Sequence, residues 1–293
     1  MDTTAATNIA MCQWDAAQYL IFSDNVFNQL IYYSHLLPLA ASLLLGIFVI
    51  ANGYKSNAAR ALFFSIIVLN IWLLCDLVLW ATDKPAYTMF FWSIINMVEP
   101  MIYAGILFFL YFFLDNKAPS FRSTFIIIAL LLPIVVLTPT TLALSGFDLT
   151  NCDREAIEGP MVYYGYFIEI ILTMWILGFG IRRFFMEKFR QRRAEILLVV
   201  SSSIFLLLSF AIGNVIGSLF VDWTIGQYGL FGIPIFAALL AFLIVRFQAF
   251  NIKLISTQVL VVALWLLVLA ILFIREIETI RIVVSITLIL FTL

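Results

Sequence analysis

The chain has 293 residues, of which 64% are hydrophobic and only 11% are charged, and its formal net charge is −1. A typical soluble domain is about 45–50% apolar and about 25% charged, so this chain lacks the polar residues that a soluble surface needs. The composition excludes a soluble enzyme, a disordered chain and a disulfide-rich secreted module. Without a basic excess, it also indicates no nucleic-acid partner. It predicts an all-α, polytopic transmembrane helical bundle whose surroundings are the lipid bilayer.

Apolar runs of about 20 residues, the length of a helix that crosses a ~30 Å hydrocarbon core, follow one another along the chain. They lack the period-two alternation of a membrane β-barrel. We expect an external segment over residues 1–29, a seven-helix domain over 30–250, and a joint with a helical hairpin over 251–293. Seven complete runs are followed by an eighth and by a short ninth: Leu30–Ala51, Ala61–Trp80, Tyr87–Leu114, Ser123–Leu142, Met161–Ile181, Ile196–Val221, Tyr228–Val245, Ile255–Ile274 and Ile282–Leu293.

Lysine and arginine are concentrated in every second loop. Such loops lie in the cytoplasm by the positive-inside rule, so we expect a multi-pass protein of the plasma membrane with its N-terminus outside. The opposite side holds only Lys84, Arg154, Arg275 and Arg281. The other twelve basic residues define the cytoplasmic loops: Lys55, Arg60, Lys117, Arg122, Arg182, Arg183, Lys188, Arg190, Arg192, Arg193, Arg246 and Lys253.

Ionisable side chains inside membrane spans are costly and are candidates for function. We count four, His35, Asp76, Glu99 and Glu169. His35 and Asp76 are expected in the outer half of the membrane, and Glu99 and Glu169 near its middle. Two interpretations stay open: an outward-opening polar cavity that binds a small ligand or reports protonation, or hydrogen bonds that hold helices together.

Further polar, thiol and aromatic side chains extend these interpretations. Asn96 and Asn214 join the signal-sensing candidates because they occur in runs of the same expected bundle. Cys12 and Cys152 both fall on the expected external side, where a disulfide is permitted, and two free thiols are the alternative. Several aromatic residues occur near the outer ends of the runs, which favours an interfacial belt over an aromatic ligand cage: Trp80, Tyr87, Trp92, Tyr163, Tyr164, Tyr166, Trp223 and Tyr228.

Seven runs followed by the basic and aromatic stretch RFQAFNIKLI, residues 246–255, resemble the N-terminal seven-helix sensor region of bacterial histidine kinases. The resemblance implies a sensor that passes an external or intramembrane stimulus to a cytoplasmic kinase, with a homodimeric state and a response regulator as partner. The only histidine, His35, is not on the cytoplasmic side, so no phosphoacceptor is recognised. The ninth run would span only about 18 Å. We expect the natural chain to continue, and a re-entrant or interfacial end is the alternative.

Other functions are less well supported by the sequence. A small-molecule or ion transporter or channel is the main alternative, because it would also explain intramembrane carboxylates; no internal repeat is visible, which argues against it. The seventh run has no lysine for a retinal Schiff base. Neither an HExxH zinc pair nor a GxSxG nucleophile elbow occurs. We expect no cofactor, no metal and no catalytic residue in this chain.

Overall fold

A computed structural model describes residues 17–23, 29–148, 155–220 and 223–247. Within these ranges six helical stretches are long and apolar enough to cross a membrane, which confirms an all-α polytopic bundle. The eighth and ninth runs, and most of the two flanking segments, lie outside the described residues. The helices are α2 (Gln29–Gly53), α3 (Asn57–Ala81), α4 (Pro85–Asp115), α5 (Phe121–Leu137), α6 (Pro160–Met186), α7 (Arg190–Phe220), α8 (Trp223–Gly229) and α9 (Gly232–Phe247).

The fourth and seventh runs differ from their predicted form. Helix α5 ends at Leu137 rather than Leu142 and is shorter than the six spanning helices. The residue after its cap is Pro139, which has no N–H to donate and cannot extend the helix. The seventh run begins earlier than expected, because Trp223 starts a separate short helix, α8, that precedes α9. Counted together, α8 and α9 form one span over Trp223–Ile244.

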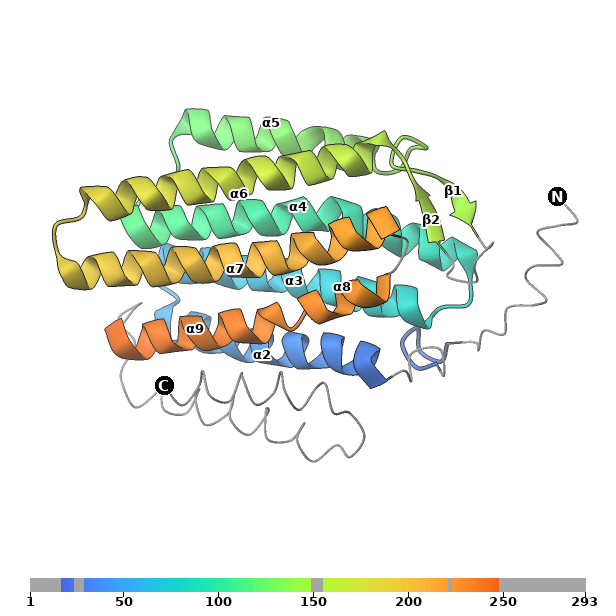
Figure 1. Ribbon diagram of the computed structural model, residues 1–293, viewed down its shortest axis with the longest axis horizontal. Helices are drawn as coiled ribbons and strands as arrows, with labels where there is room; N and C mark the ends of the chain where they lie inside the picture. Colours follow the sequence, from blue (N-terminus) through green and yellow to red (C-terminus); the bar gives the residue numbers. More distant parts are fainter. Residues whose placement is uncertain (1–16, 24–28, 149–154, 221–222, 248–293) are drawn as a thin grey trace, which may run out of the picture.

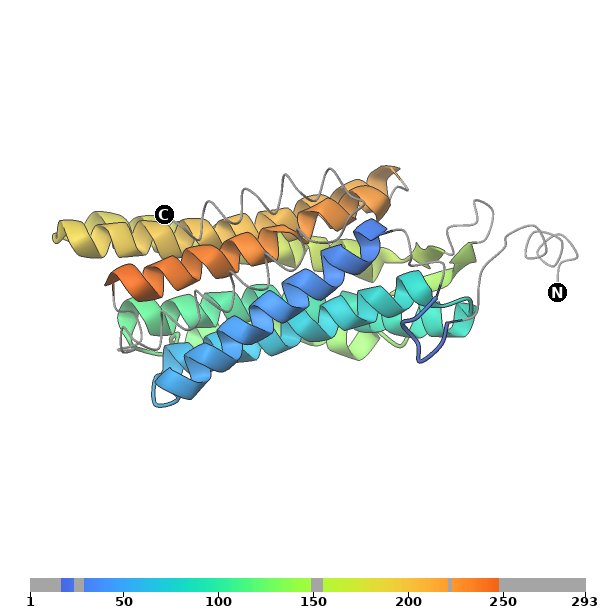
Figure 2. The same cartoon turned by 90° about the horizontal axis from the view of Figure 1, so that it is seen from below.

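The spanning helices form a closed ring, and α5 packs on the outside of it. Around the ring α2 contacts α3, α3 contacts α4, α4 contacts α6, α6 contacts α7, α7 contacts α9, and α9 returns to α2. Helix α4 is central, because it also contacts α5, α7 and both β-strands. Figure 1 shows the helices running side by side, and Figure 2 shows α2 crossing the others obliquely.

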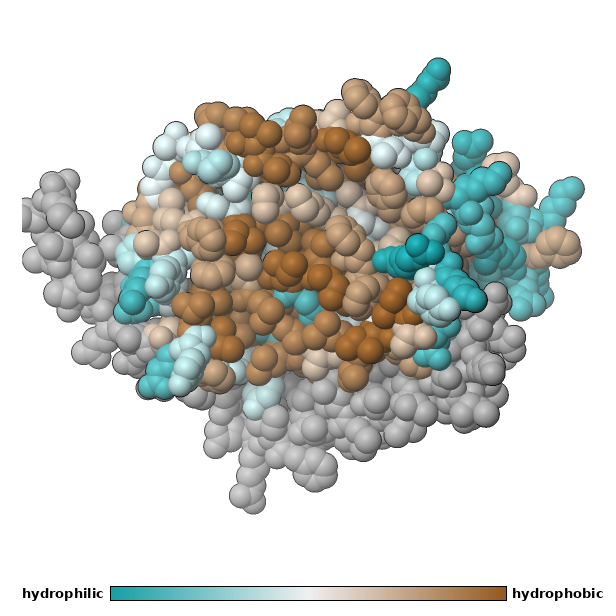
Figure 3. Space-filling model, turned by 180° about the vertical axis from the view of Figure 1, so that it is seen from behind, coloured by the Kyte–Doolittle hydropathy of each residue, from teal (hydrophilic) through white to brown (hydrophobic). Residues whose placement is uncertain are grey.

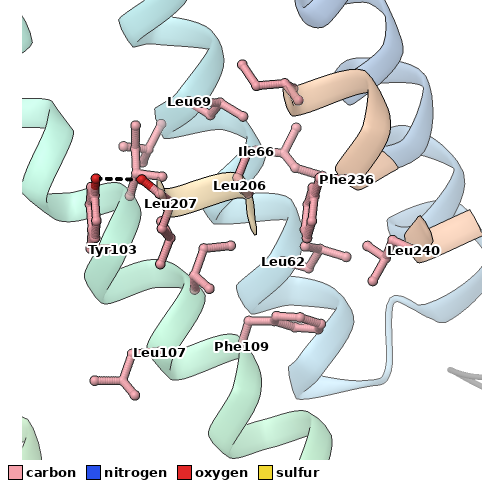
Figure 4. Packing of buried hydrophobic residues seen from close by; sticks show 14 of the residues in the cluster. Leu62, Ile66, Leu69, Tyr103, Leu107, Phe109, Leu206, Leu207, Phe236 and Leu240 are labelled. Carbon is pink, nitrogen blue, oxygen red and sulfur yellow. Dashed lines mark hydrogen bonds between the residues drawn. The ribbon is translucent and has the colours of Figure 1, made fainter. Parts of the chain in front are cut away.

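The core of the ring is filled by leucine, isoleucine and phenylalanine side chains from α3, α4, α7 and α9 (Figure 4). Among them lies the fully buried Tyr103, whose hydroxyl donates to the backbone carbonyl of Leu207 at 3.1 Å. In lipid such packing depends on van der Waals contact and hydrogen bonding, since the lipid tails are as apolar as the side chains. On the face drawn in Figure 3 the middle is mostly apolar, and hydrophilic side chains gather toward the two ends.

The two ends of the bundle have different structures. At one end a two-stranded antiparallel sheet, β1 (Leu144–Asp148) and β2 (Glu155–Glu158), links α5 to α6; we call this the hairpin end. Its apolar residues Leu144 and Ala156 pack with Trp92 of α4, so the strands are anchored to the bundle. The sequence pattern did not predict these strands. We call the opposite end, where Arg182–Arg193 joins α6 to α7, the basic end.

Candidate functional site

A cavity opens between the helices at the hairpin end. It offers about 80 Å³ to the centres of water-sized molecules, and because one ordered water needs roughly 10–15 Å³ by that measure, several waters or a small ligand would fit. Its walls come from α3, α4, α6, α7, α8 and β2. The lining residues are Trp72, Asp76, Leu79, Trp80, Thr88, Trp92, Ile95, Asn96, Glu99, Glu158, Tyr166, Ser209, Phe210, Asn214, Trp223, Gly226, Gln227 and Leu230.

Helical spacing explains why α4 contributes so much of this wall. Thr88, Trp92, Asn96 and Glu99 line the cavity and are separated by four, four and three residues, so they share one face of the helix. Eleven residues at 1.5 Å each carry that face about 16 Å along the helix axis. The cavity wall therefore extends from the first turn of α4 to the carboxyl group of Glu99, deep within the bundle.

Glu99 is 4% exposed and is held by two donors on neighbouring helices. The indole Nε1 of Trp72 on α3 donates to Oε2 at 3.2 Å, and Nδ2 of Asn214 on α7 donates to Oε1. Because each oxygen has a second lone pair, the carboxyl group keeps acceptor capacity after both bonds are made. Trp72 itself is fixed by an edge-on contact with Phe210, with ring centroids 4.4 Å apart.

His35 on α2 and Asp76 on α3 form the second polar contact of the site. His35 Nδ1 lies 2.7 Å from the backbone carbonyl of Ile31, which can only accept, so Nδ1 carries a hydrogen. Nε2 lies 2.8 Å from Oδ2 of Asp76, and this short contact needs a proton between the two atoms. The pair is either imidazolium with carboxylate or neutral imidazole with carboxylic acid. Asp76 lines the cavity. His35 is not among the lining residues and contacts Asp76 from α2.

Helix α8 joins the cavity to α2 and α7. Gln227 of α8 lines the cavity and its Oε1 accepts from the Ser34 hydroxyl at 2.9 Å. On the other side α8 rests directly on the backbone of α7: a Cβ added at Gly229 would lie 2.3 Å from the Ser209 carbonyl oxygen. No side chain separates the two helices at this point, so α8 cannot move closer to α7 without displacing it.

The β-hairpin adds acidic and aromatic groups at the mouth of the site. Glu158 of β2 lines the cavity and accepts from the Tyr166 hydroxyl at 3.5 Å. Glu155 accepts from the indole N–H of Trp223 at 3.0 Å. The Trp223 ring stands perpendicular to Trp92, with centroids 5.2 Å apart. These contacts tie β2, α4 and α8 together around the opening.

The structure brings together most of the sequence-predicted polar residues. Asp76, Asn96, Glu99 and Asn214 line one cavity, and His35 contacts Asp76. Glu169 is the exception, since it is 4% exposed but is absent from the lining and interacts instead with Tyr103. The proposed disulfide between Cys12 and Cys152 lies outside the described residues.

The aromatic residues divide between the two predicted roles. Trp80, Trp92, Tyr166 and Trp223 line the cavity, so the interpretation of all eight as a belt is too simple. Three others are turned outward, as an interfacial belt requires: Tyr87 at 40% exposure, Tyr163 at 57% and Tyr228 at 49%. Residues that the sequence analysis missed are Trp72, Glu158 and Gln227. The four-residue spacing of Trp72 and Asp76 would have placed them on one face of α3.

The charge of the lining is one-sided. Three carboxyl groups, those of Asp76, Glu99 and Glu158, face the cavity, and no lysine or arginine is among the described lining residues. The described residues also hold no group of three or more His, Cys, Asp and Glu that is arranged to bind a metal ion. Compared with known proteins, the chain matches no family model, no curated protein and no solved structure.

Proposed function

We propose that this chain is the membrane-embedded signal-sensing module of a two-component sensor histidine kinase, which transmits a stimulus through its last helices to a cytoplasmic kinase. The observation that carries the proposal is that α8 lines the cavity and leads directly into α9. A ligand that changes the position of Trp223 or Gln227 therefore acts on the helix that continues toward the C-terminal side. Residues 246–255 resemble the joint of such kinases. From this resemblance we propose the cytoplasmic kinase, the response regulator and the homodimeric state.

The charge distribution supports an orientation in the plasma membrane. Arg182, Arg183 and Lys188 belong to the basic end, and by the positive-inside rule that end faces the cytoplasm. The hairpin end and its cavity then face outward, where a soluble stimulus arrives. In this orientation the N-terminus is outside, and α9 runs toward the cytoplasm.

Transmission requires two arrangements of the last helices whose balance the ligand changes. The break between α8 and α9, at Leu230 and Phe231, is a natural pivot. The hydrogen bond between Ser34 and Gln227 joins α8 to α2. Occupation of the cavity would strain or replace that bond and change the angle at which α9 leaves the bundle.

A chimera of residues 1–293 with a soluble histidine-kinase core tests this proposal. Asn96→Phe fills the cavity and Gln227→Ala releases α8 from α2; each should change autophosphorylation in isolated membranes by about fivefold or more, the usual size of an allosteric coupling. Met174→Phe is the matched control, because Met174 is 61% exposed on the outside of α6. Autophosphorylation equal to the control in both variants, with normal membrane insertion, would contradict sensing.

Reconstitution separates this function from the transporter or channel alternative. The two buried carboxylates Glu99 and Glu169 are the observation that favours transport. A sensor should produce no flux of protons, ions or small solutes in proteoliposomes. Flux that disappears in Glu99→Gln would replace the sensing proposal by the transport one.

A further inference from the structure

We infer that the cavity at the hairpin end binds a small organic ammonium ion that carries a hydrogen-bond acceptor such as a hydroxyl group. The inference rests on the proposed sensing function, because it names the chemical class of the stimulus that would be sensed. It rests on the geometry of the cavity for its evidence: carboxylates, aromatic faces and one unpaired donor surround a space of small volume.

The first step is the sign of the charge. Glu99 and Glu158 line the cavity together with Asp76, and the described lining has no cationic side chain. His35 faces Asp76 from α2 and can compensate that one carboxyl group. The donors to Glu99 are an indole and an amide, which are neutral. An anionic ligand would find no lysine or arginine among the described lining residues. A cation would be attracted by the carboxyl groups, and a primary ammonium ion could also donate charge-assisted hydrogen bonds to them.

The second step is the aromatic content of the walls. Trp72, Trp80, Trp92 and Trp223 line the cavity, together with Tyr166 and Phe210. A cation over the face of a tryptophan ring is stabilised by the quadrupole of the ring, and desolvation strengthens this attraction. A bare metal ion would need several oxygen ligands at about 2.0–2.6 Å, and the described residues offer no metal-binding cluster. An organic ammonium ion matches both kinds of wall, because its positively charged N-alkyl groups can lie over the rings while its charge also attracts the carboxyl groups.

The third step is the unpaired donor. Nδ2 of Asn96 is buried and is the one buried side-chain nitrogen or oxygen of the described residues that has no hydrogen-bond partner. A buried donor without a partner costs roughly 1–3 kcal/mol, so an acceptor supplied by a ligand is favourable. Asn96 lies one turn before Glu99 on the same face of α4. A ligand with a hydroxyl group near its ammonium centre can contact both residues.

Binding is measured by tryptophan fluorescence, because four of the seven tryptophans of the chain line the cavity. Choline and ethanolamine are titrated into the full chain in nanodiscs of phosphatidylglycerol, whose headgroup contains no amine. Both should give saturable changes, and 3,3-dimethyl-1-butanol, the neutral analogue of choline, should give none. Sodium chloride at equal ionic strength controls for screening.

Variants locate the site. Glu99→Gln removes the carboxyl group deep in the cavity and should weaken choline binding about tenfold or more, as expected for loss of a charged partner of the bound cation. Glu158→Gln tests the same loss at a half-buried position where folding is less at risk. Asp83→Asn is the matched control, because Asp83 lies in the loop between α3 and α4 at the same end but does not line the cavity. Choline affinity should stay unchanged in that variant.

The ammonium group can come from a free solute or from a lipid headgroup. Nanodiscs of phosphatidylcholine distinguish the two sources: prior occupation by headgroups would produce the fluorescence change without added choline and abolish the response to it. Equal responses to choline and its neutral analogue, no response to either amine, or binding that is unchanged in both glutamate variants would overturn the inference. The sensing proposal would survive any of these results if Asn96→Phe still changes kinase output.

Discussion

Carboxyl groups have different kinds of hydrogen-bond partner at the two ends of the bundle. At the basic end Asp115 pairs with Arg183, and Glu195 pairs with Arg192. At the hairpin end Glu99 is bound by an indole and an amide, and Asp76 by a histidine. The basic end holds its charges in pairs near water, and the hairpin end holds its carboxyl groups around a cavity without a cationic wall. The first arrangement is typical of charged residues that stabilise the ends of helices, and the second is typical of a ligand-binding site.

Breaking the buried pair of the hairpin end should have the largest effect on stability. His35→Leu leaves Asp76 without its partner. Because His35 is 1% exposed and Asp76 is 15% exposed, we expect a cost of about 3 kcal/mol, the lower end of the range for buried pairs. The double variant His35→Leu with Asp76→Leu should recover part of that loss, because no polar group of the pair is then left without its partner. The free energy of unfolding, measured by SDS titration in detergent micelles, checks both values. A double variant less stable than the single one would show that the pair does not act as a unit.

Removing one donor to Glu99 should have an intermediate effect. Trp72→Phe keeps the ring but removes the N–H that binds Oε2, and the loss of a bond to a carboxylate is expected to cost about 2 kcal/mol. Trp175→Phe is the matched control, since the Trp175 indole donates to a neutral acceptor, the Tyr111 hydroxyl, at 3.2 Å. That bond is worth about 1 kcal/mol. Equal losses in the SDS titration would mean that Glu99 is not special among the acceptors of this bundle.

The ion pairs of the basic end should matter less. Arg183→Gln removes the partner of Asp115 from a side chain that is 36% exposed, and partly exposed pairs contribute about 0–1 kcal/mol. The difference from the parent protein should shrink at high salt, because screening weakens pairs that water can reach. SDS titrations at low and high sodium chloride measure it. A loss as large as that of His35→Leu would remove the contrast between the ends.

The smallest effect concerns Glu187, in the loop after α6. The backbone N–H of Phe189 donates to its carboxylate, as does that of Lys188, and the Phe189 bond is the main cause of a lowered pKa of this carboxyl group. A lowered pKa stabilises the folded loop above the ordinary glutamate pKa, and this contribution is lost as the pH falls through the lowered value. Carboxyl ¹³C NMR, with Glu187→Gln to assign the signal, should show a midpoint below that of free glutamate. A midpoint at or above the ordinary value would contradict the loop geometry.

Prediction from the sequence succeeded where a property is repeated along the chain. The apolar runs gave six spanning helices, because each must satisfy its own backbone hydrogen bonds in lipid. Prediction was less accurate where a single residue or a short contact determines where an element begins or ends. Pro139 follows the cap of α5, which ends at Leu137, and the seventh run is divided into α8 and α9 by an early helix start at Trp223. The β-hairpin had no periodic signal, since its strands are short and owe their position to packing on Trp92.

For the candidate site, the sequence by itself identified the costly residues. Asp76, Glu99 and His35 stand out because charge is rare in an apolar run, and Asn96 and Asn214 follow from the same argument. Only the tertiary structure decided which of them meet. Glu169 satisfies the same sequence criterion but lies with Tyr103 and not in the cavity lining, while Trp72, Glu158 and Gln227 enter the site from elements distant in sequence. Helical periodicity fixes the face of one helix, but the contacts among six helices depend on how their surfaces pack.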